Sequence, residues 1–376
     1  MEKNKAKKII IMIILTMFFL GIITVIGIYL GNEEFRVWSD KNILAKDIEE
    51  NKLPIIDLTS TDNTKVFAYG SNVVTLENNN LSIYNKSANK IKDLNLTISN
   101  PIFQSEGDYL LVADEGGSKV YLIYNDTIQW EKDVDGEIAR TTVNKNGEVG
   151  IVVTGTTYKS VIIMYDINGK ENFKTFLSTT SATDISLSED GKYLAFIEIN
   201  TLGATITSKV KNISVSKAIS TPSEAIVNTY DANSNVLFMK IKYNKNRITV
   251  LGDDGVYSFY NGNSEKIINL DNNISFIDIN LDGYVASVKE ESGKFDLNLT
   301  GVDNTKVNTY LINDTIKNIY CNDNITAIDI GNRVEFVNSS GWLAKKFNSN
   351  QNIKDIIIGK TVAVIVYKDR AEVISI

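Results

Sequence analysis

The stretch ISLSEDGKYL, residues 185–194, alternates apolar and polar residues, turns at Asp190-Gly191 and enters a second apolar run. The same pattern returns in TVNKNGEVGI at residues 142–151 and in IDINLDGYVA at residues 277–286. Alternation with a period of two is typical of a half-buried β-strand, and Asn, Asp or Gly between two such runs indicates a turn. These stretches therefore predict a β-hairpin that recurs along the chain.

Equivalent turns lie 36 to 55 residues apart through the rest of the sequence. Their positions are Gly70, Gly107, Gly147, Gly191, Asn246, Gly283, Asp323 and Gly359. A four-stranded repeat of about 40–50 residues is typical of a β-propeller blade. The sequence predicts an all-β fold, a β-propeller of about eight four-stranded blades. A seven-bladed ring, with one turn misassigned, is the alternative.

The last repeat is short of one strand. After residues 361–367 only residues 371–376 remain, which leaves no fourth strand for this unit. A spare apolar run, Pro54–Thr59, precedes the first unit. An open blade would leave an unpaired sheet edge, so we expect residues 54–59 to complete the final blade and close the ring.

An apolar stretch without charge, residues 9–30, precedes the repeats. As a helix its 22 residues would reach roughly 33 Å, enough to cross a hydrocarbon core of about 30 Å. Lysines precede it and Glu33-Glu34 follow it, which places the N-terminus in the cytoplasm by the positive-inside rule. A cleaved signal peptide is the alternative, but its apolar core is usually shorter. We expect an uncleaved, single-pass transmembrane helix.

The chain therefore divides into four segments: a basic cytoplasmic tail (1–8), the transmembrane helix (9–30), a juxtamembrane connector (31–52) and an extracytoplasmic propeller (53–376). In the connector, Ser39-Asp40 could cap a short helix with Ile43, Leu44 and Ile48 on one face. We expect this connector to hold the propeller close to the bilayer of a bacterial cytoplasmic membrane.

Charge and residue types narrow the function. The net charge is −7 although the N-terminal tail is basic, so the propeller is acidic and a poor candidate for binding nucleic acid. There is no histidine, which removes the commonest general base and metal ligand. The one cysteine, Cys321, is expected in the core rather than as a nucleophile. No cofactor and no metal site are predicted.

Two loops are the candidate binding site. Residues 154–160 are rich in threonine, and the 55-residue fourth unit carries an insertion near residues 201–208. Binding residues concentrate in such loops, and these two belong to adjacent units. The candidate residues are Thr156, Thr157, Tyr158, Lys159, Ser160, Thr205 and Thr207. The alternative is that both are only longer solvated hairpins.

Two functions follow from these features. The first is a non-enzymatic, membrane-tethered scaffold or sensor component that binds an envelope protein or polymer. The second is an envelope glycan hydrolase or lyase that uses carboxylates in the central channel, for which Asp184, Asp278 and Asp355 on predicted inner strands are candidates. Turn-capping or solvated aspartates are the simpler interpretation of these three residues.

Some segments resemble known families. Asn125–Glu131, followed by Asp135-Gly136, resembles the repeat of quinoprotein-type propellers, and Asp166–Phe173 and Gly341-Trp342 are weaker matches. This resemblance implies a propeller but not the quinone cofactor, because vicinal cysteines and histidines are absent.

The arrangement of basic tail, anchor, Phe35-Arg36-Val37-Trp38 and propeller resembles a family of uncharacterised Gram-positive membrane proteins. The most recognisable stretches are residues 99–103 and 155–160. The family has no established activity, so the resemblance implies topology and no chemistry.

Overall fold

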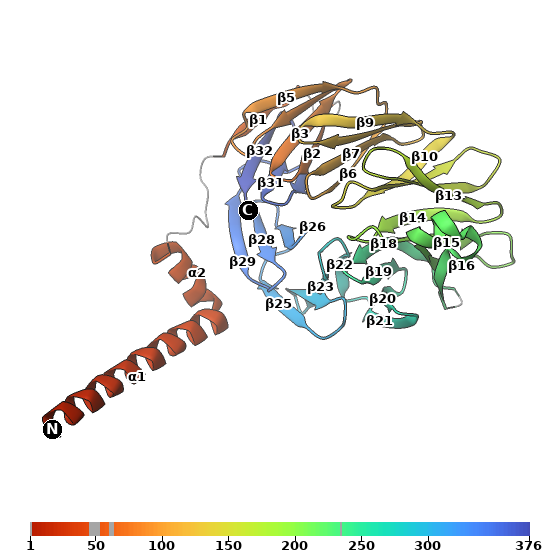
Figure 1. The fold of residues 1–376 in the computed structure, drawn as a ribbon. Coiled ribbons are helices and arrows are strands. Elements are labelled where there is room, and N and C mark those ends of the chain that lie inside the picture. Colours follow the sequence, from red (N-terminus) through yellow and green to blue (C-terminus); the bar gives the residue numbers. More distant parts are fainter. Residues whose placement is uncertain (1, 45–52, 60–63, 234) are drawn as a thin grey trace.

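A computed structural model describes residues 2–44, 53–59, 64–233 and 235–376. Two helices, α1 (Glu2–Gly31) and α2 (Glu33–Asn42), precede a ring of antiparallel sheets (Figure 1). Within the described residues the ring has eight sheets of four strands each, which we number as blades 1 to 8 along the chain. The eight-bladed prediction is confirmed, and the seven-bladed alternative is wrong.

The first four blades are built in chain order from the inner to the outer strand. Their strands are β2 (Thr64–Tyr69), β3 (Asn72–Glu77), β4 (Asn80–Tyr84) and β5 (Lys90–Asn95); β6 (Pro101–Glu106), β7 (Tyr109–Asp114), β8 (Lys119–Tyr124) and β9 (Thr127–Asp133); β10 (Glu137–Val143), β11 (Val149–Thr154), β12 (Ser160–Tyr165) and β13 (Glu171–Leu177); β14 (Ser181–Leu187), β15 (Tyr193–Asn200), β16 (Thr207–Ser214) and β17 (Ile226–Asp231).

Blades 5 to 7 repeat this order, and blade 8 departs from it. The strands are β18 (Phe238–Asn244), β19 (Arg247–Gly252), β20 (Gly255–Tyr260) and β21 (Asn263–Asn269); β22 (Ile274–Asp278), β23 (Tyr284–Glu291), β24 (Lys294–Gly301) and β25 (Val307–Ile312); β26 (Asn318–Asn322), β27 (Ile325–Asp329), β28 (Arg333–Asn338) and β29 (Leu343–Asn348); β30 (Asp355–Ile358), β31 (Val362–Val366), β32 (Arg370–Ser375) and β1 (Ile55–Asp57).

Blade 8 closes the ring as the sequence predicts. Its outer strand is β1, which pairs antiparallel with β32 through Ile55–Glu372, Ile56–Ala371 and Asp57–Arg370. The backbone N–H of Val373 donates to the Pro54 carbonyl at 2.9 Å. The N-terminal strand of the propeller therefore covers the sheet edge that the C-terminal strand would otherwise expose.

The core consists of apolar layers between neighbouring blades. The middle strands β11 and β12 are buried along their whole length apart from Thr154, because each sheet lies between two others. One layer joins Leu111 and Leu122 of blade 2 to Ile151 and Ile163 of blade 3. In the same layer Trp130 donates from Nε1 to the Ile167 carbonyl at 3.1 Å. Burial on both faces explains why the middle strands read as continuous apolar runs.

The extra length of the fourth unit differs from the prediction. The loop at residues 201–206 is present, but a larger addition lies between β16 and β17. It holds helix α3 (Val215–Ser220) and the 3-10 turn η1 (Pro222–Glu224). Val215 and Ala218 are buried in the layer between blades 3 and 4, so this addition seals the outer part of that interface.

The connector helix begins earlier than the sequence predicts. Asn32 caps α2, and its side-chain oxygen accepts from the Phe35 N–H at 2.9 Å. Ser39 and Asp40 lie inside the helix near its end rather than capping it, and Ile48 lies outside the described residues. Asn32 accepts a hydrogen bond from one of the unpaired backbone N–H groups at the start of α2, and two glutamates follow it in the first turn, where negative charge is favourable. The helix therefore does not need a second cap at Ser39 and Asp40.

Helix α1 contains the apolar stretch. Residues Met12–Gly31 are long and apolar enough to cross a membrane, with a mean hydropathy of 2.6, and their side chains are exposed except for the half-buried Tyr29. These are the properties of a single-pass anchor or of a signal sequence. In Figure 1 the ring is seen along its channel, and α1 projects away from its outer edge.

The helices contact the propeller at blade 7. The guanidinium of the buried Arg36 lies 4.6 Å from the centre of the Trp342 ring, and Tyr29 packs edge-on against the same ring at 6.4 Å. The Tyr29 hydroxyl also donates to Asp40 at 2.6 Å. Trp342 lies just before β29, so the two helices meet the outer rim of blade 7, which is four blades from blade 3 in the ring of eight.

Candidate functional site

Strand direction gives the propeller two distinct faces. Because strands alternate in direction, the turns between first and second strands and between third and fourth strands lie on one face, here called the turn face. The loops between second and third strands and the connections between blades lie on the opposite face, here called the loop face. The loop face carries residues 155–159 and 201–206.

The two predicted loops meet on the loop face. The Lys159 ammonium lies 3.5 Å from the Thr201 hydroxyl of the next blade. Thr156 is half-buried, and its hydroxyl accepts from the Tyr158 N–H at 3.1 Å, which fixes the first loop. Thr157, Thr205 and Thr207 are exposed. The two loops thus form one continuous surface between blades 3 and 4.

Ser160 does not contribute to that surface. It is fully buried at the start of β12, and its hydroxyl accepts from the Ala182 N–H at 3.1 Å. This contact joins blade 3 to blade 4 beneath the loops. The residue was grouped with its neighbours because a loop–strand boundary cannot be placed to one residue by pattern alone.

Four large side chains surround the two loops, and of these only Phe176 lies outside the segments that the sequence analysis singled out. Tyr158 packs against Phe176 of β13 with 4.7 Å between ring centres. Phe176 is 51% exposed, and Leu202 and Ile206 of the second loop are 65% and 50% exposed. We call these four residues, with Lys159, the blade 3–4 patch. Large exposed apolar side chains gathered beside a cation are typical of a contact surface.

The central channel is a second candidate. It encloses about 560 Å³ and is lined by the inner strands of all eight blades. Asp184, Asp278 and Asp355 line it as predicted, but each has partners: Asp184 accepts from the Ile241 N–H at 2.9 Å, and Asp278 from the Lys240 ammonium at 3.2 Å. Asp355 accepts from the Ile356 N–H at 2.9 Å.

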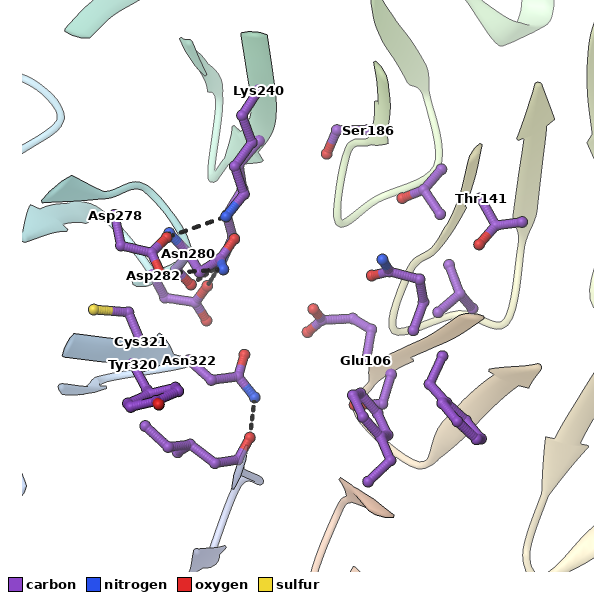
Figure 2. A pocket seen from close by; sticks show the side chains of 18 of the residues that line it. Glu106, Thr141, Ser186, Lys240, Asp278, Asn280, Asp282, Tyr320, Cys321 and Asn322 are labelled. Carbon is purple, nitrogen blue, oxygen red and sulfur yellow. Dashed lines mark hydrogen bonds and ion pairs between the residues drawn. The ribbon is translucent and has the colours of Figure 1, made fainter. Parts of the chain in front are cut away.

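The channel also holds charged residues that the sequence analysis missed. Lys242 forms an ion pair with Asp282 at 2.8 Å beside Asn280, and Figure 2 shows this group across the channel from Glu106. Burial, with the nearby charges of Asp282 and Asp323, raises the pKa of Glu106 to about 7. Glu106 and Asp282 each directly precede the turn glycine of their units, an alignment that would have identified them together.

Three further carboxylates shift in the same direction. Burial raises the pKa of Asp184, Asp323 and Asp355 above the usual range. Burial also raises the pKa of the Cys321 thiol, which is a core group as expected. Among the described residues, no group of three or more Asp, Glu, Cys or His is placed to hold a metal ion.

Several solved structures share the fold. The C-terminal WD40 domain of Sif2 has a TM-score of 0.57 at 12% identity, covering 87% of this chain and 99% of that domain. Sqt1 of Chaetomium thermophilum, bound to the N-terminus of a ribosomal protein, has 0.54 at 13% identity over 86% and 100%. BamB from Moraxella catarrhalis has 0.50 at 12% identity over 86% and 96%. At these identities the likeness shows the propeller fold alone.

No curated protein matches the sequence significantly. One family of sequences does, and its match covers residues 49–376, which is the propeller and the last part of the connector. The chain therefore belongs to DUF5711, a family of unknown function.

Proposed function

We propose that this protein is a non-enzymatic scaffold, or part of a sensor, that is tethered to the bacterial cytoplasmic membrane by α1 and binds an envelope protein or polymer outside the cell. The blade 3–4 patch carries the proposal. It joins exposed aromatic and aliphatic side chains to a lysine that has no carboxylate within 4 Å among the described ion pairs. Such a surface fits a partner segment with an apolar side chain beside an acidic one.

The position of the anchor supports this proposal. Tyr29 and Arg36 hold the helices against Trp342 in blade 7, and the patch lies on blades 3 and 4, on the far side of the ring. A protein held at blade 7 would present the patch away from the bilayer, where a large partner could reach it. Propellers of similar shape support the idea as well, since Sqt1 is bound to a protein terminus.

Site-specific photocrosslinking in cells tests the patch. A benzophenone amino acid in place of Leu202 is expected to give discrete crosslinked species, because this side chain is 65% exposed within the patch. The control is the same replacement at Leu311, which is 66% exposed on β25 of blade 6. Equal yields from the two positions, or none from Leu202, would contradict the proposed surface.

Cysteine labelling tests the topology. Cys321 is the sole cysteine and is buried, so the wild-type chain is expected to react little with a maleimide that cannot cross membranes. Thr201→Cys places a thiol on the exposed loop, and we expect at least tenfold more labelling in intact cells. Labelling that appears only after permeabilisation would place the propeller in the cytoplasm and refute the proposed orientation.

A glycan hydrolase or lyase is the second candidate, and Glu106 is the observation that favours it. A carboxyl with a pKa of about 7 that faces Asp282 across the channel has the properties of a general acid. The enzyme hypothesis ranks second because the three predicted carboxylates, Asp184, Asp278 and Asp355, are held by hydrogen bonds or an ion pair. If Glu106→Gln removed a hydrolytic activity of the purified full chain toward envelope glycan, this order would reverse.

A further inference from the structure

A groove between blades 4 and 5 opens on the turn face, away from the blade 3–4 patch. It encloses about 310 Å³, at the lower end of the range for small-ligand sites. Its wall carries Tyr193, Tyr230, Tyr243 and Tyr260 together with several asparagines. We propose that this groove binds a neutral saccharide. The inference does not rest on the proposed scaffold function, since it concerns another face and other residues.

Aromatic rings form the platform of the groove. Tyr193 and Tyr243 stack nearly parallel, with 6.4 Å between ring centres and 14° between planes. Tyr193 is 37% exposed and Tyr243 is 9% exposed, so the outer ring is open to a ligand and the inner ring supports it. The apolar C–H face of a pyranose matches the negatively polarised face of such a ring in both shape and polarity.

A buried amide on the groove wall lacks a partner. Asn212 is 6% exposed, and its side-chain oxygen has no hydrogen bond among the described residues. A buried acceptor that has no hydrogen bond destabilises the folded chain. A ligand hydroxyl or acetamido N–H that donates to this oxygen would satisfy it.

Tyr243 supplies the complementary donor. The Asn212 side-chain N–H donates to the Tyr243 hydroxyl at 3.3 Å, which leaves the hydroxyl hydrogen free to point elsewhere. Burial raises the pKa of Tyr243 to about 12, so this hydrogen is retained at neutral pH. A sugar hydroxyl can donate to Asn212 and accept from Tyr243 at once, whereas an ammonium ion or a carboxylate can do only one of the two.

The charges of the groove favour a neutral ligand. Asp190 accepts from the Ser188 hydroxyl at 2.9 Å and pairs with Lys192 at 2.8 Å. Lys245, the other charged residue of the lining, has its ammonium beside Gly283 of blade 6. The Arg247 guanidinium covers the Tyr260 ring at 4.9 Å. The remaining polar lining includes the amides of Asn228, Asn246 and Asn261, which both donate and accept. Amides beside aromatic rings suit the alternating hydroxyl and C–H surfaces of a pyranose.

Saturation-transfer NMR on the full chain tests the inference, in micelles of an amine-oxide detergent so that no detergent sugar competes. The probes are cellotriose and triacetylchitotriose, which distinguish plain hydroxyls from acetamido groups. We expect one of them to receive saturation, and Tyr193→Ala to weaken its binding at least tenfold. The matched control is Tyr84→Ala, because Tyr84 is a half-buried tyrosine on blade 1, across the ring from the groove, and should leave binding unchanged.

Three results would overturn the inference. They are the absence of transfer to both sugars, binding that survives Tyr193→Ala, and equal losses in the two tyrosine variants. Asn212→Asp adds an independent readout, because it keeps the shape and an acceptor but loses the N–H that orients Tyr243. If Asn212→Asp melts at the wild-type temperature, weaker binding in that variant reports on the groove and not on folding.

Discussion

Replacing Ile56 by alanine is expected to lower the free energy of unfolding of the propeller by about 2–5 kcal/mol, the usual cost of truncating a buried isoleucine. Ile56 is 3% exposed in β1, where it packs in the layer with Val364 and Val373. The strand has only three residues and three pairs with β32, so it has little else to hold it in place. Truncation of Ile56 should therefore open blade 8 before any other blade unfolds.

The neighbouring residue provides the control. Ile55 is 49% exposed on the other face of the same strand, so Ile55→Ala should change stability by about 0.5 kcal/mol or less. Urea unfolding of the full chain in micelles, followed by far-ultraviolet circular dichroism, measures both variants. Equal effects of the two substitutions would mean that β1 does not hold the ring closed.

Glu106→Gln is expected to stabilise the protein at pH 8 by about 3 kcal/mol, since raising a pKa from 4.5 to about 7 costs about 1.4 kcal/mol for each tenfold change in acidity. The folded pKa of about 7 exceeds the ordinary 4.5 because the carboxyl is buried near Asp282 and Asp323. Between pH 4.5 and 7 the unfolded chain releases this proton and the folded chain keeps it, so stability falls as the pH rises. Above pH 7 the free-energy cost of holding ionised Glu106 in the channel is constant, and replacement by glutamine removes this cost.

The pH dependence separates this explanation from a simple change in packing. At pH 4 the carboxyl is protonated in both states, so Glu106→Gln should have little effect there. Glu131→Gln on the exposed face of β9 is the control and should be neutral at both pH values. Destabilisation by Glu106→Gln at pH 8, or the same effect at pH 4 and pH 8, would refute a destabilising charge in the channel.

The fold could be predicted because its information is local and repeated. Gly107, Gly147 and Gly191 were identified as turns from neighbouring residues, and each adopts the positive φ that glycine tolerates best. In blade 5 the left-handed residue is Lys245 rather than Asn246, a shift of one position that left the count of blades intact. The closing strand followed from a sheet edge that had to be covered.

The sites could be predicted only in part, because they depend on distances around the ring. Glu106 and Asp282 lie far apart in the sequence, and only closure of eight blades brings their charges across one channel. Asn212 and Tyr243 come from adjacent blades. A sequence pattern cannot show that the side-chain oxygen of Asn212 lacks a hydrogen-bond partner. The loops at residues 155–159 and 201–206 were recognised because loop composition is visible locally.

The pairing of β1 with β32 also determines how the molecule would carry mechanical load. The chain that follows α2 enters the propeller at β1, so tension on α1 is transmitted first to the contact of Arg36 with Trp342 and then to the three pairs of β1. Strand β1, which closes the ring, is therefore the element expected to detach first under tension. Pulling on α1 would open blade 8 from its outer edge while the other seven blades remain intact.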